Sequence, residues 1–297
     1  MIKRIFLLII LFSSAILLSQ ENSDPQNQKS WYVSLSKSRS EVNPYEKRLY
    51  LDIFGPYKPD LRNNLNHVEF NLSKKFNSSN LGFYFEFYEA TKRNYSLYYV
   101  TFSGRTIVNE ELKPIGDYFR TQSRIGLNYF FTQRIYFHVG SRYFKSQLSD
   151  GFSNSFQIDF GQKYIGAEAG INIKSSRFYG LYLEARITGF YLYGRSTQDY
   201  SFRTRSADFG VISVDINPIT RVTGLEILTK LGFYFNDSIF MSLGYRSTNQ
   251  KIRPDDLRVY SGDQSFDNEL NFRYGQRGLN SYNDIFTSIL FEVGTEI

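Results

Sequence analysis

Hydrophobic and polar residues alternate with a period of two along most of the chain, from about residue 67 to the C-terminus. Within 225–235, for example, Leu225 and Leu231 share one parity, whereas Glu226 and Lys230 share the other. A period of two is the repeat of a β-strand whose two faces meet different surroundings. The pattern therefore predicts strands with one apolar and one polar face. The same alternation occurs in 68–76, 81–87, 119–131, 134–143, 165–173, 181–193, 239–245 and 285–297.

The connections between these strands differ in length at the two ends. Short polar segments predict hairpin turns at 77–80, 132–134, 174–177 and 236–238. The opposite ends of the same strands are joined by long polar stretches at about 92–116, 148–159, 196–219 and 253–282. Short turns at one end and long external loops at the other are typical of a transmembrane β-barrel.

The expected fold class is all-β, a transmembrane antiparallel up-and-down barrel. In hydrocarbon every backbone N–H and C=O must pair within the protein, so a sheet can cross only if it closes on itself. Counting strands back from the C-terminus gives nine from residue 67 onward, and an even barrel needs one more. Trp31–Ser36 and Arg48–Phe54 compete for that place. Using one gives about ten strands, the preferred number within a range of 8–12; using both, with Leu97–Phe102, gives twelve.

The last strand, 285–297, alternates to the end of the chain and resembles the C-terminal assembly signal of bacterial outer-membrane β-barrel proteins. It departs from the usual terminal Phe or Trp because it ends in Ile297. The resemblance to this broad class covers essentially all of the mature sequence. It implies two partners, outer-membrane lipid and the outer-membrane assembly machinery, and it carries over no functional residues.

The N-terminus has the order of a secretory signal peptide: a basic start at Met1–Arg4, an uncharged apolar run at Ile5–Leu18, then a polar stretch. The apolar run spans only about 21 Å as a helix, short of the roughly 30 Å hydrocarbon core. Cleavage after Ser19 or after Ala15 would satisfy the small-residue rule. We expect a signal peptide at 1–19 and a barrel at 20–297, located in the outer membrane of a diderm, Gram-negative-type bacterium after cleavage.

Composition removes several classes of protein. The chain has no cysteine, which excludes disulfide frameworks, thiolate nucleophiles and Cys-ligated metal sites. Aromatic residues make up 18% and charged residues 22%, which argues against disorder. The net charge is +6, but the Lys and Arg residues are spread among 29 Asp and Glu residues rather than gathered in a stripe, so no nucleic-acid partner is expected. An exported soluble β-sandwich is the remaining structural alternative.

The polar parity collects charged residues that we expect to face the lumen of the barrel. Opposite charges in a narrow, partly desolvated lumen should pair, because an unpaired one is costly. If the hairpin at 174–177 takes its simplest register, Glu168 and Arg186 face one another. Such a network predicts either a charged constriction that selects small ions or solutes, or a salt-bridged plug. The expected lumen set is Arg120, Arg124, Arg142, Arg186, Lys230, Arg246, Glu69, Glu86, Glu168, Glu184, Glu226 and Glu292.

Catalytic motifs are scarce in the sequence, which contains no Gly-rich phosphate loop, no His-Glu-x-x-His and no Gly-x-Ser-x-Gly. The better catalytic candidate of the two histidines is His67, with Glu69 on the same parity near the long-loop end; His138 lies near a short turn. The acidic loop 253–271 lacks the order of a calcium-binding loop. No metal or cofactor is expected.

The sequence thus predicts a non-enzymatic outer-membrane barrel that acts as a small porin-like pore, or as a surface-exposed binding or structural envelope protein. An external ligand would meet the long loops. The alternatives are an outer-membrane enzyme that hydrolyses or acylates envelope lipid, using His67 and Glu69, and a secreted soluble β-sandwich.

Overall fold

The computed structural model describes residues 31–42, 63–76, 79–103, 106–150, 156–203, 211–216, 219–255 and 282–297. No helix in these ranges is long and apolar enough to span a membrane. The strands in chain order are β1 (Trp31–Val42), β2 (Asn63–Lys75), β3 (Leu81–Ser103), β4 (Thr106–Phe130), β5 (Ile135–Asp150), β6 (Phe156–Lys174), β7 (Leu181–Arg203), β8 (Val211–Ile216), β9 (Ile219–Tyr234), β10 (Ile239–Asp255) and β11 (Tyr282–Glu296).

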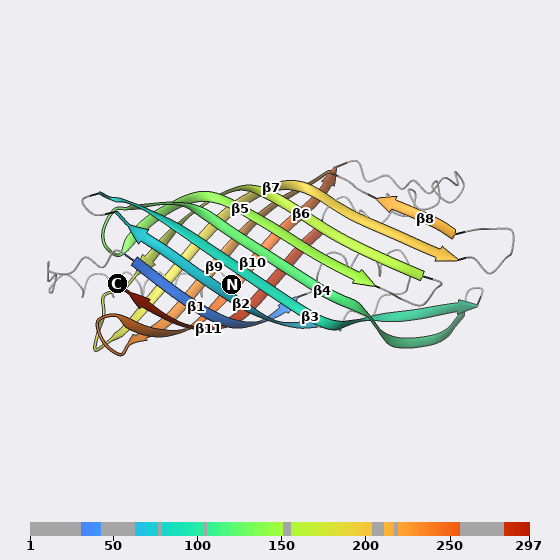
Figure 1. Cartoon of the computed structure of the whole chain (residues 1–297), viewed down its shortest axis with the longest axis horizontal. Coiled ribbons are helices and arrows are strands. Elements are labelled where there is room, and N and C mark those ends of the chain that lie inside the picture. The colour runs from blue at the N-terminus through green and yellow to red at the C-terminus, as the bar shows by residue number, and fades with distance from the viewer. Residues whose placement is uncertain are drawn as a thin grey trace.

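Ten of these strands form one closed antiparallel barrel (Figure 1). Neighbouring strands pair in chain order, except that β9 pairs with β7, and β8 pairs with the far part of β7. The first strand closes the barrel on the last, with Tyr32 opposite Glu296. Closure leaves the wall without a free edge, which is the condition for a sheet to cross hydrocarbon. The predicted ten-strand antiparallel barrel is confirmed.

The place left open in the strand count is filled by β1, which contains Trp31–Ser36 and runs on to Val42. The competing segment Arg48–Phe54 lies outside the described residues. Leu97–Phe102 is no separate strand but continues β3. The barrel therefore has ten wall strands, the number preferred from the sequence.

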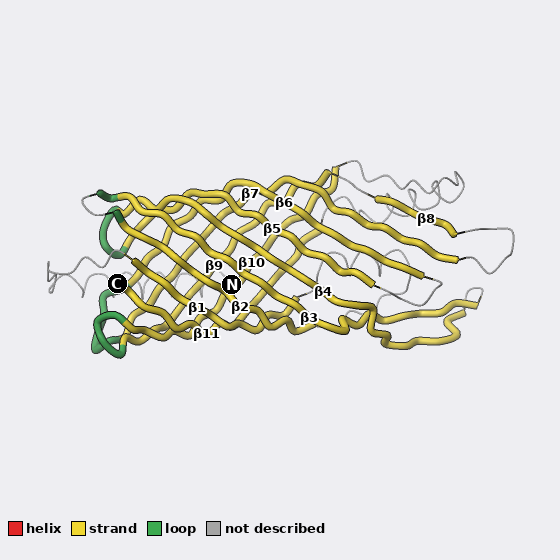
Figure 2. Tube along the Cα trace, viewed as in Figure 1, coloured by secondary structure: helices red, strands yellow, loops and turns green. Residues whose placement is uncertain are grey.

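The short connections lie together at one end of the barrel (Figure 2). The Asn236 side chain accepts hydrogen bonds from the backbone N–H groups of Ser238 and Ile239, at 2.8 and 2.7 Å, and so closes the β9–β10 turn locally. The start of β1 and the C-terminus lie at the same end, where the Trp31 backbone N–H donates to the Ile297 carbonyl at 2.9 Å. By the usual orientation of such barrels, this end is the periplasmic one.

At the opposite end the prediction of long loops was partly wrong. Most of 92–116 belongs to β3 and β4, which continue past their neighbours as a two-stranded ribbon with register shifts near Tyr95. Likewise β7 continues to Arg203 and pairs there with β8. Beyond the hydrocarbon both faces of a ribbon can meet water, so its residues need not alternate between apolar and polar, and a strand there resembles a polar loop in the sequence.

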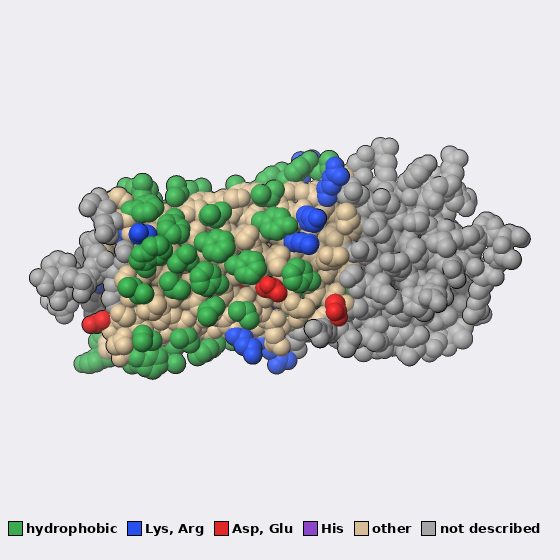
Figure 3. Space-filling view, viewed as in Figure 1, with side chains coloured by type: hydrophobic (Ala, Val, Ile, Leu, Met, Phe, Trp, Pro, Cys, Tyr) green, Lys and Arg blue, Asp and Glu red, His purple; other side chains and the backbone are tan. Residues whose placement is uncertain are grey.

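The outer surface of the wall is apolar and the inner surface is polar. In β9 exposed and less accessible residues alternate along the strand. After Arg221 and Thr223 on the outward face, the outward residues from Leu225 to Phe233 are apolar except for Thr229, and Phe235 follows in the turn. That length matches the 9–11 residues with which a strand tilted by about 45° crosses a bilayer. Figure 3 shows apolar side chains spread over this outer surface. Aromatic residues border it at both ends, among them Tyr129, Phe131, Phe178, Tyr179, Tyr191 and Tyr193, all at least 45% exposed.

Inside the wall, glycines leave room for large side chains from neighbouring strands. A Cβ at Gly232 on β9 would lie 2.2 Å from ring carbons of Tyr182 on β7. Similarly, a Cβ at Gly224 would lie 2.2 Å from the ring of Phe190. These close approaches let aromatic rings lie flat over the wall, where they fill the lumen and hold the strand register.

Candidate functional site

The inward faces of the strands bring charged side chains together in the middle of the barrel. Closure forces every second residue of each strand into the lumen. Four of the charged ones, Arg124, Arg142, Glu168 and Glu226, are at most 3% exposed. A buried ion costs several kcal/mol unless it is paired and hydrogen-bonded, so the partners of these groups decide whether the arrangement is stable.

These four residues form a closed ring of alternating charge. The Arg124 Nε donates to both Glu168 oxygens at 2.8 and 2.9 Å, and its Nη1 donates to Glu226 at 3.3 Å. The Arg142 Nε donates to Glu168 at 2.7 Å, and its Nη1 donates to Glu226 at 3.3 Å. Each carboxylate thus bridges the two guanidinium groups, and the ring joins β4, β5, β6 and β9.

Two more charges extend the ring to six strands. Glu86 on β3 accepts a hydrogen bond from the Arg124 Nη1 at 2.6 Å and from both terminal nitrogens of Arg186 on β7. Arg186 also lies 3.7 Å from Glu226. The six residues, here called the central network, comprise Glu86, Arg124, Arg142, Glu168, Arg186 and Glu226. Three arginines and three glutamates cancel in charge, so the network neutralises itself across the lumen.

Two ion pairs lie beside the central network. Arg246 on β10 donates from both terminal nitrogens to Glu69 on β2, at 2.6 and 2.7 Å, in a bidentate geometry. Lys230 on β9 lies 2.9 Å from Glu292 on β11, which also accepts hydrogen bonds from Ser34 and Ser242 at 2.6 and 2.7 Å. Both pairs cross over intervening strands and so tie the wall together through its interior.

The remaining members of the expected lumen set have other partners. The Arg120 guanidinium lies over the rings of Phe144 and Phe286, at 4.7 and 4.5 Å from their centroids, an arrangement that favours a cation–π contact. Glu184 accepts a hydrogen bond from Asn172 at 2.9 Å. The structure therefore places all twelve side chains on the inward face, although they form several separate groups.

The predicted pairing of Glu168 with Arg186 is wrong. In the observed register Asn172 lies opposite Arg186, and Glu168 lies opposite Phe190. The turn between β6 and β7 reaches its tip at Phe178–Leu181, with Tyr179 at φ 50° and Gly180 at φ 83°, rather than at 174–177. A left-handed conformation at two consecutive residues suits this tight reversal, and the longer turn shifts every cross-strand partner.

Both histidines are buried and face the lumen. His67 lies near Ser40, whose Oγ is 3.1–3.2 Å from the two ring nitrogens, and near Tyr88. Glu69 is 3.8 Å from the His67 Nε2, beyond hydrogen-bonding distance, and both of its oxygens are held by Arg246. His138 lies 3.1 Å from the Thr188 hydroxyl. Within the described ranges, neither histidine has a carboxylate aligned to orient it as a general base.

Sequence reasoning missed several neutral residues that complete the lumen contacts. The Tyr84 hydroxyl donates to Glu168 at 2.7 Å, and the Tyr32 hydroxyl donates to Glu292 at the same distance. Ser34, Ser36, Ser38 and Ser40 form a run of small buried residues on β1. Alternating serines on one parity of 31–40 were a visible signal of an inward face, but hydroxyls are too common in sequences for their partners to be inferred.

An aromatic layer fills the lumen near the short-turn end. The rings of Tyr182, Tyr234, Phe240 and Tyr32 pack against one another with centroid distances between 5.1 and 6.2 Å, in stacked, tilted and edge-to-face arrangements. Beside it Glu296 accepts hydrogen bonds from Lys174 and Arg177, both at 2.7 Å. Lys174 at the end of β6, Arg177 in the turn that follows and Glu296 on β11 thus form an ion-paired cluster next to this layer.

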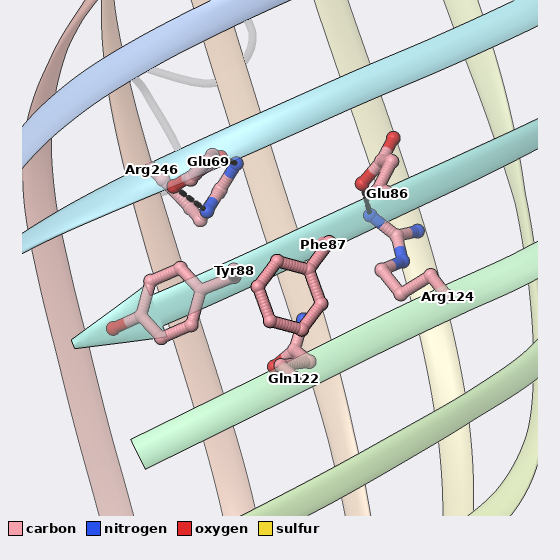
Figure 4. Close-up of a pocket in the computed structure, with 7 residues that line it drawn as sticks. All are labelled: Glu69, Glu86, Phe87, Tyr88, Gln122, Arg124 and Arg246. Carbon is pink, nitrogen blue, oxygen red and sulfur yellow. Dashed lines mark hydrogen bonds and ion pairs between the residues drawn. The ribbon is translucent and has the colours of Figure 1, made fainter. Parts of the chain in front are cut away.

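Between the Glu69–Arg246 pair and the Glu86–Arg124 contact lies a small polar cavity, lined also by Phe87, Tyr88 and Gln122 (Figure 4). It has room for about one water molecule. Among the described residues no cluster of His, Asp or Glu could hold a metal ion. Most of the acidic loop at 253–271 lies outside the described residues.

No protein-family model matches the chain, and no curated protein matches its sequence. Three solved structures that it resembles illustrate the range of neighbours. They are the outer membrane protease OmpT from Escherichia coli (9% identity, TM-score 0.46, 94% of this chain and 99% of that chain), Neisserial surface protein A (8%, 0.28, 90% and 97%) and the Pseudomonas putida toluene transporter TodX (8%, 0.33, 91% and 90%).

The class of the protein follows from its own geometry. A closed ten-strand antiparallel barrel with an apolar outer band, a polar lumen and short turns at one end is the architecture of bacterial outer-membrane β-barrel proteins. It agrees with the outer-membrane location expected from the sequence.

Proposed function

We propose that this outer-membrane barrel has a lumen closed to solutes and serves as a surface-exposed binding or structural element of the envelope, without catalytic activity. The sequence left open a porin-like pore and a surface-exposed binding or structural protein, and we propose the second of these roles. The central network carries the proposal. Its six charged side chains reach across the lumen from β3, β4, β5, β6, β7 and β9, and they neutralise one another.

A pore would need a continuous water path, and the packing of the lumen argues against one. The aromatic layer lies on the periplasmic side of the central network, and Arg120 with its two phenylalanines lies on the other. Paired charges also offer an ion little to bind, since each carboxylate of the ring already accepts hydrogen bonds from two arginines. Selective channels instead present groups that replace an ion's hydration shell.

The external end supports a role at the surface. The ribbon formed by 91–103 of β3 and 106–116 of β4 extends beyond the strands that flank it in the wall. Among the described residues neither edge of this ribbon is paired with a third strand. Unpaired strand edges can bind an extended peptide by adding a strand, with affinity from main-chain hydrogen bonds. An external protein ligand at this end is part of the proposal.

The proposal excludes the lipid-modifying enzyme because Glu69 is engaged by Arg246 and is not aligned with His67. It includes removal of 1–19 as a signal peptide, although these residues lie outside the described ranges. It also includes insertion by the outer-membrane assembly machinery, for which the alternating strand 285–297 would be the signal.

Conductance in planar bilayers tests the sealed lumen. We expect the folded wild-type barrel to give no steady single-channel steps at moderate voltage, because in this proposal the central network and the aromatic layer interrupt the water path. A porin measured under the same conditions serves as the positive control, and protease resistance of the reconstituted barrel verifies insertion. Regular ohmic steps from inserted wild-type protein would contradict the proposal and restore the porin-like role.

A further inference from the structure

Three basic residues stand side by side on the outer surface near the external end. Lys145 on β5 lies opposite Lys163 on β6, which in turn lies opposite Arg195 on β7. Side chains directly opposite on one face of a sheet have Cβ atoms about 4.5–5.5 Å apart. Like charges at that separation repel one another, so the arrangement favours an anion bound against them. We call these three residues the basic row.

No acidic side chain is directly in register with a member of the basic row among the described residues; the acid of the same row, Glu89 on β3, lies one strand beyond Thr121. On β4 the residue in register with Lys145 is Thr121, and on β9 the residue in register with Arg195 is Ile219. Lys163 and Arg195 are exposed, and none of the three makes an ion pair within the described part of the chain. Farther along β9, by contrast, Arg221 is paired with Asp255 at 2.7 Å.

An apolar row lies directly below the basic row, on the membrane side. Tyr143, Ile165 and Tyr193 occupy consecutive register positions on β5, β6 and β7. They are 36, 59 and 49% exposed, so they belong to the outer band that meets lipid. The two rows together form an amphiphilic surface, basic toward the external side and apolar toward the bilayer. Figure 3 shows the same division on the face it presents, with several Lys and Arg at the border of the apolar surface.

We propose that this surface binds an outer-leaflet lipid that carries more than one phosphate. The basic row would hold the phosphates through charge-assisted hydrogen bonds, and the apolar row would contact the acyl chains. The position supports this occupant because the long-connection end is the external one, where the headgroups of the outer leaflet lie. The site is on the outside of the wall, so the test of this proposal does not depend on whether the lumen is sealed.

Lipid binding to the purified, detergent-solubilised barrel tests this site. The probe is a bisphosphorylated, acylated glucosamine disaccharide, titrated and detected by native mass spectrometry. We expect the triple variant Lys145→Gln, Lys163→Gln, Arg195→Gln to bind it at least about tenfold more weakly, because each cation near an anionic headgroup contributes appreciably. The control variant Lys37→Gln, Arg39→Gln, Lys74→Gln removes the same charge from β1 and β2 and should bind within about twofold of wild type.

Two further arms use the unaltered protein, so they decide the question even if the triple variant does not fold. The same lipid without its phosphates should bind at least about tenfold more weakly than the bisphosphorylated form. Inorganic pyrophosphate alone should bind far more weakly than the lipid, because it lacks acyl chains for the apolar row. Equal binding of the phosphorylated and dephosphorylated lipids, equal binding by the triple variant and wild type, or pyrophosphate binding as tight as lipid would each overturn the proposal.

Discussion

Replacing Glu168 with alanine is expected to lower the free energy of unfolding by about 3–5 kcal/mol, the largest effect of any single change considered for this barrel. Glu168 accepts hydrogen bonds from Arg124, Arg142 and Tyr84 at 2.7–2.9 Å. Its removal leaves two guanidinium groups in the lumen with fewer compensating charges. The cost arises from those buried, partly uncompensated ions rather than from the lost contacts alone.

Urea-induced unfolding of the barrel from lipid vesicles, followed by the fluorescence of the single tryptophan, measures this loss. The matched control is Glu89→Ala, which removes an exposed, outward-facing glutamate from β3 and should change stability by less than about 0.5 kcal/mol. In a double-mutant cycle, Arg142→Ala should cost less in the Glu168→Ala background than in wild type. The central network would be contradicted if Glu168→Ala were no more destabilising than Glu89→Ala.

Arginine at Leu231 is expected to cost about 2–4 kcal/mol, the second largest effect, because a charge at the bilayer midplane loses its hydration. Leu231 is 53% exposed in the middle of the outward face of β9, and its register neighbours Leu183 and Leu243 are also exposed. The same unfolding measurement applies. The control is Thr223→Arg, on the same strand and face but near the external border of the membrane. There the arginine meets polar surroundings, and the cost should fall to about 0–1 kcal/mol. Equal tolerance at the two positions would mean that this face does not meet lipid.

The fold was predictable because membrane crossing constrains a strand residue by residue. Every second side chain between Leu225 and Phe235 meets lipid, so the face assignment can be read directly from the sequence. The same constraint ends at the membrane border. For that reason the continuation of β3 and β4 through 92–116 could not be distinguished from a loop, although the hairpin connectivity there was correct.

The pairing inside the lumen could not be predicted for a different physical reason. Arg186 contacts Glu86, 100 residues earlier in the chain, because barrel closure and strand tilt bring β3 and β7 into reach across the interior. Local alternation indicates which side chains turn inward, but it contains no information on the stagger between strands. Even within one hairpin, the conformation of Tyr179 and Gly180 moved the partner of Arg186 from Glu168 to Asn172.

Nitroxide labels placed one at a time along 225–235 would test the sealed, membrane-spanning barrel most sharply, and the absence of native cysteine makes such labelling clean. In vesicles, odd-numbered positions should be open to dissolved oxygen, which concentrates in lipid, whereas even-numbered positions should be shielded from both oxygen and a water-soluble nickel chelate. Access of the chelate to Glu226, Leu228 or Lys230 would reveal a water-filled channel, and loss of the odd–even difference would rule out contact with the bilayer.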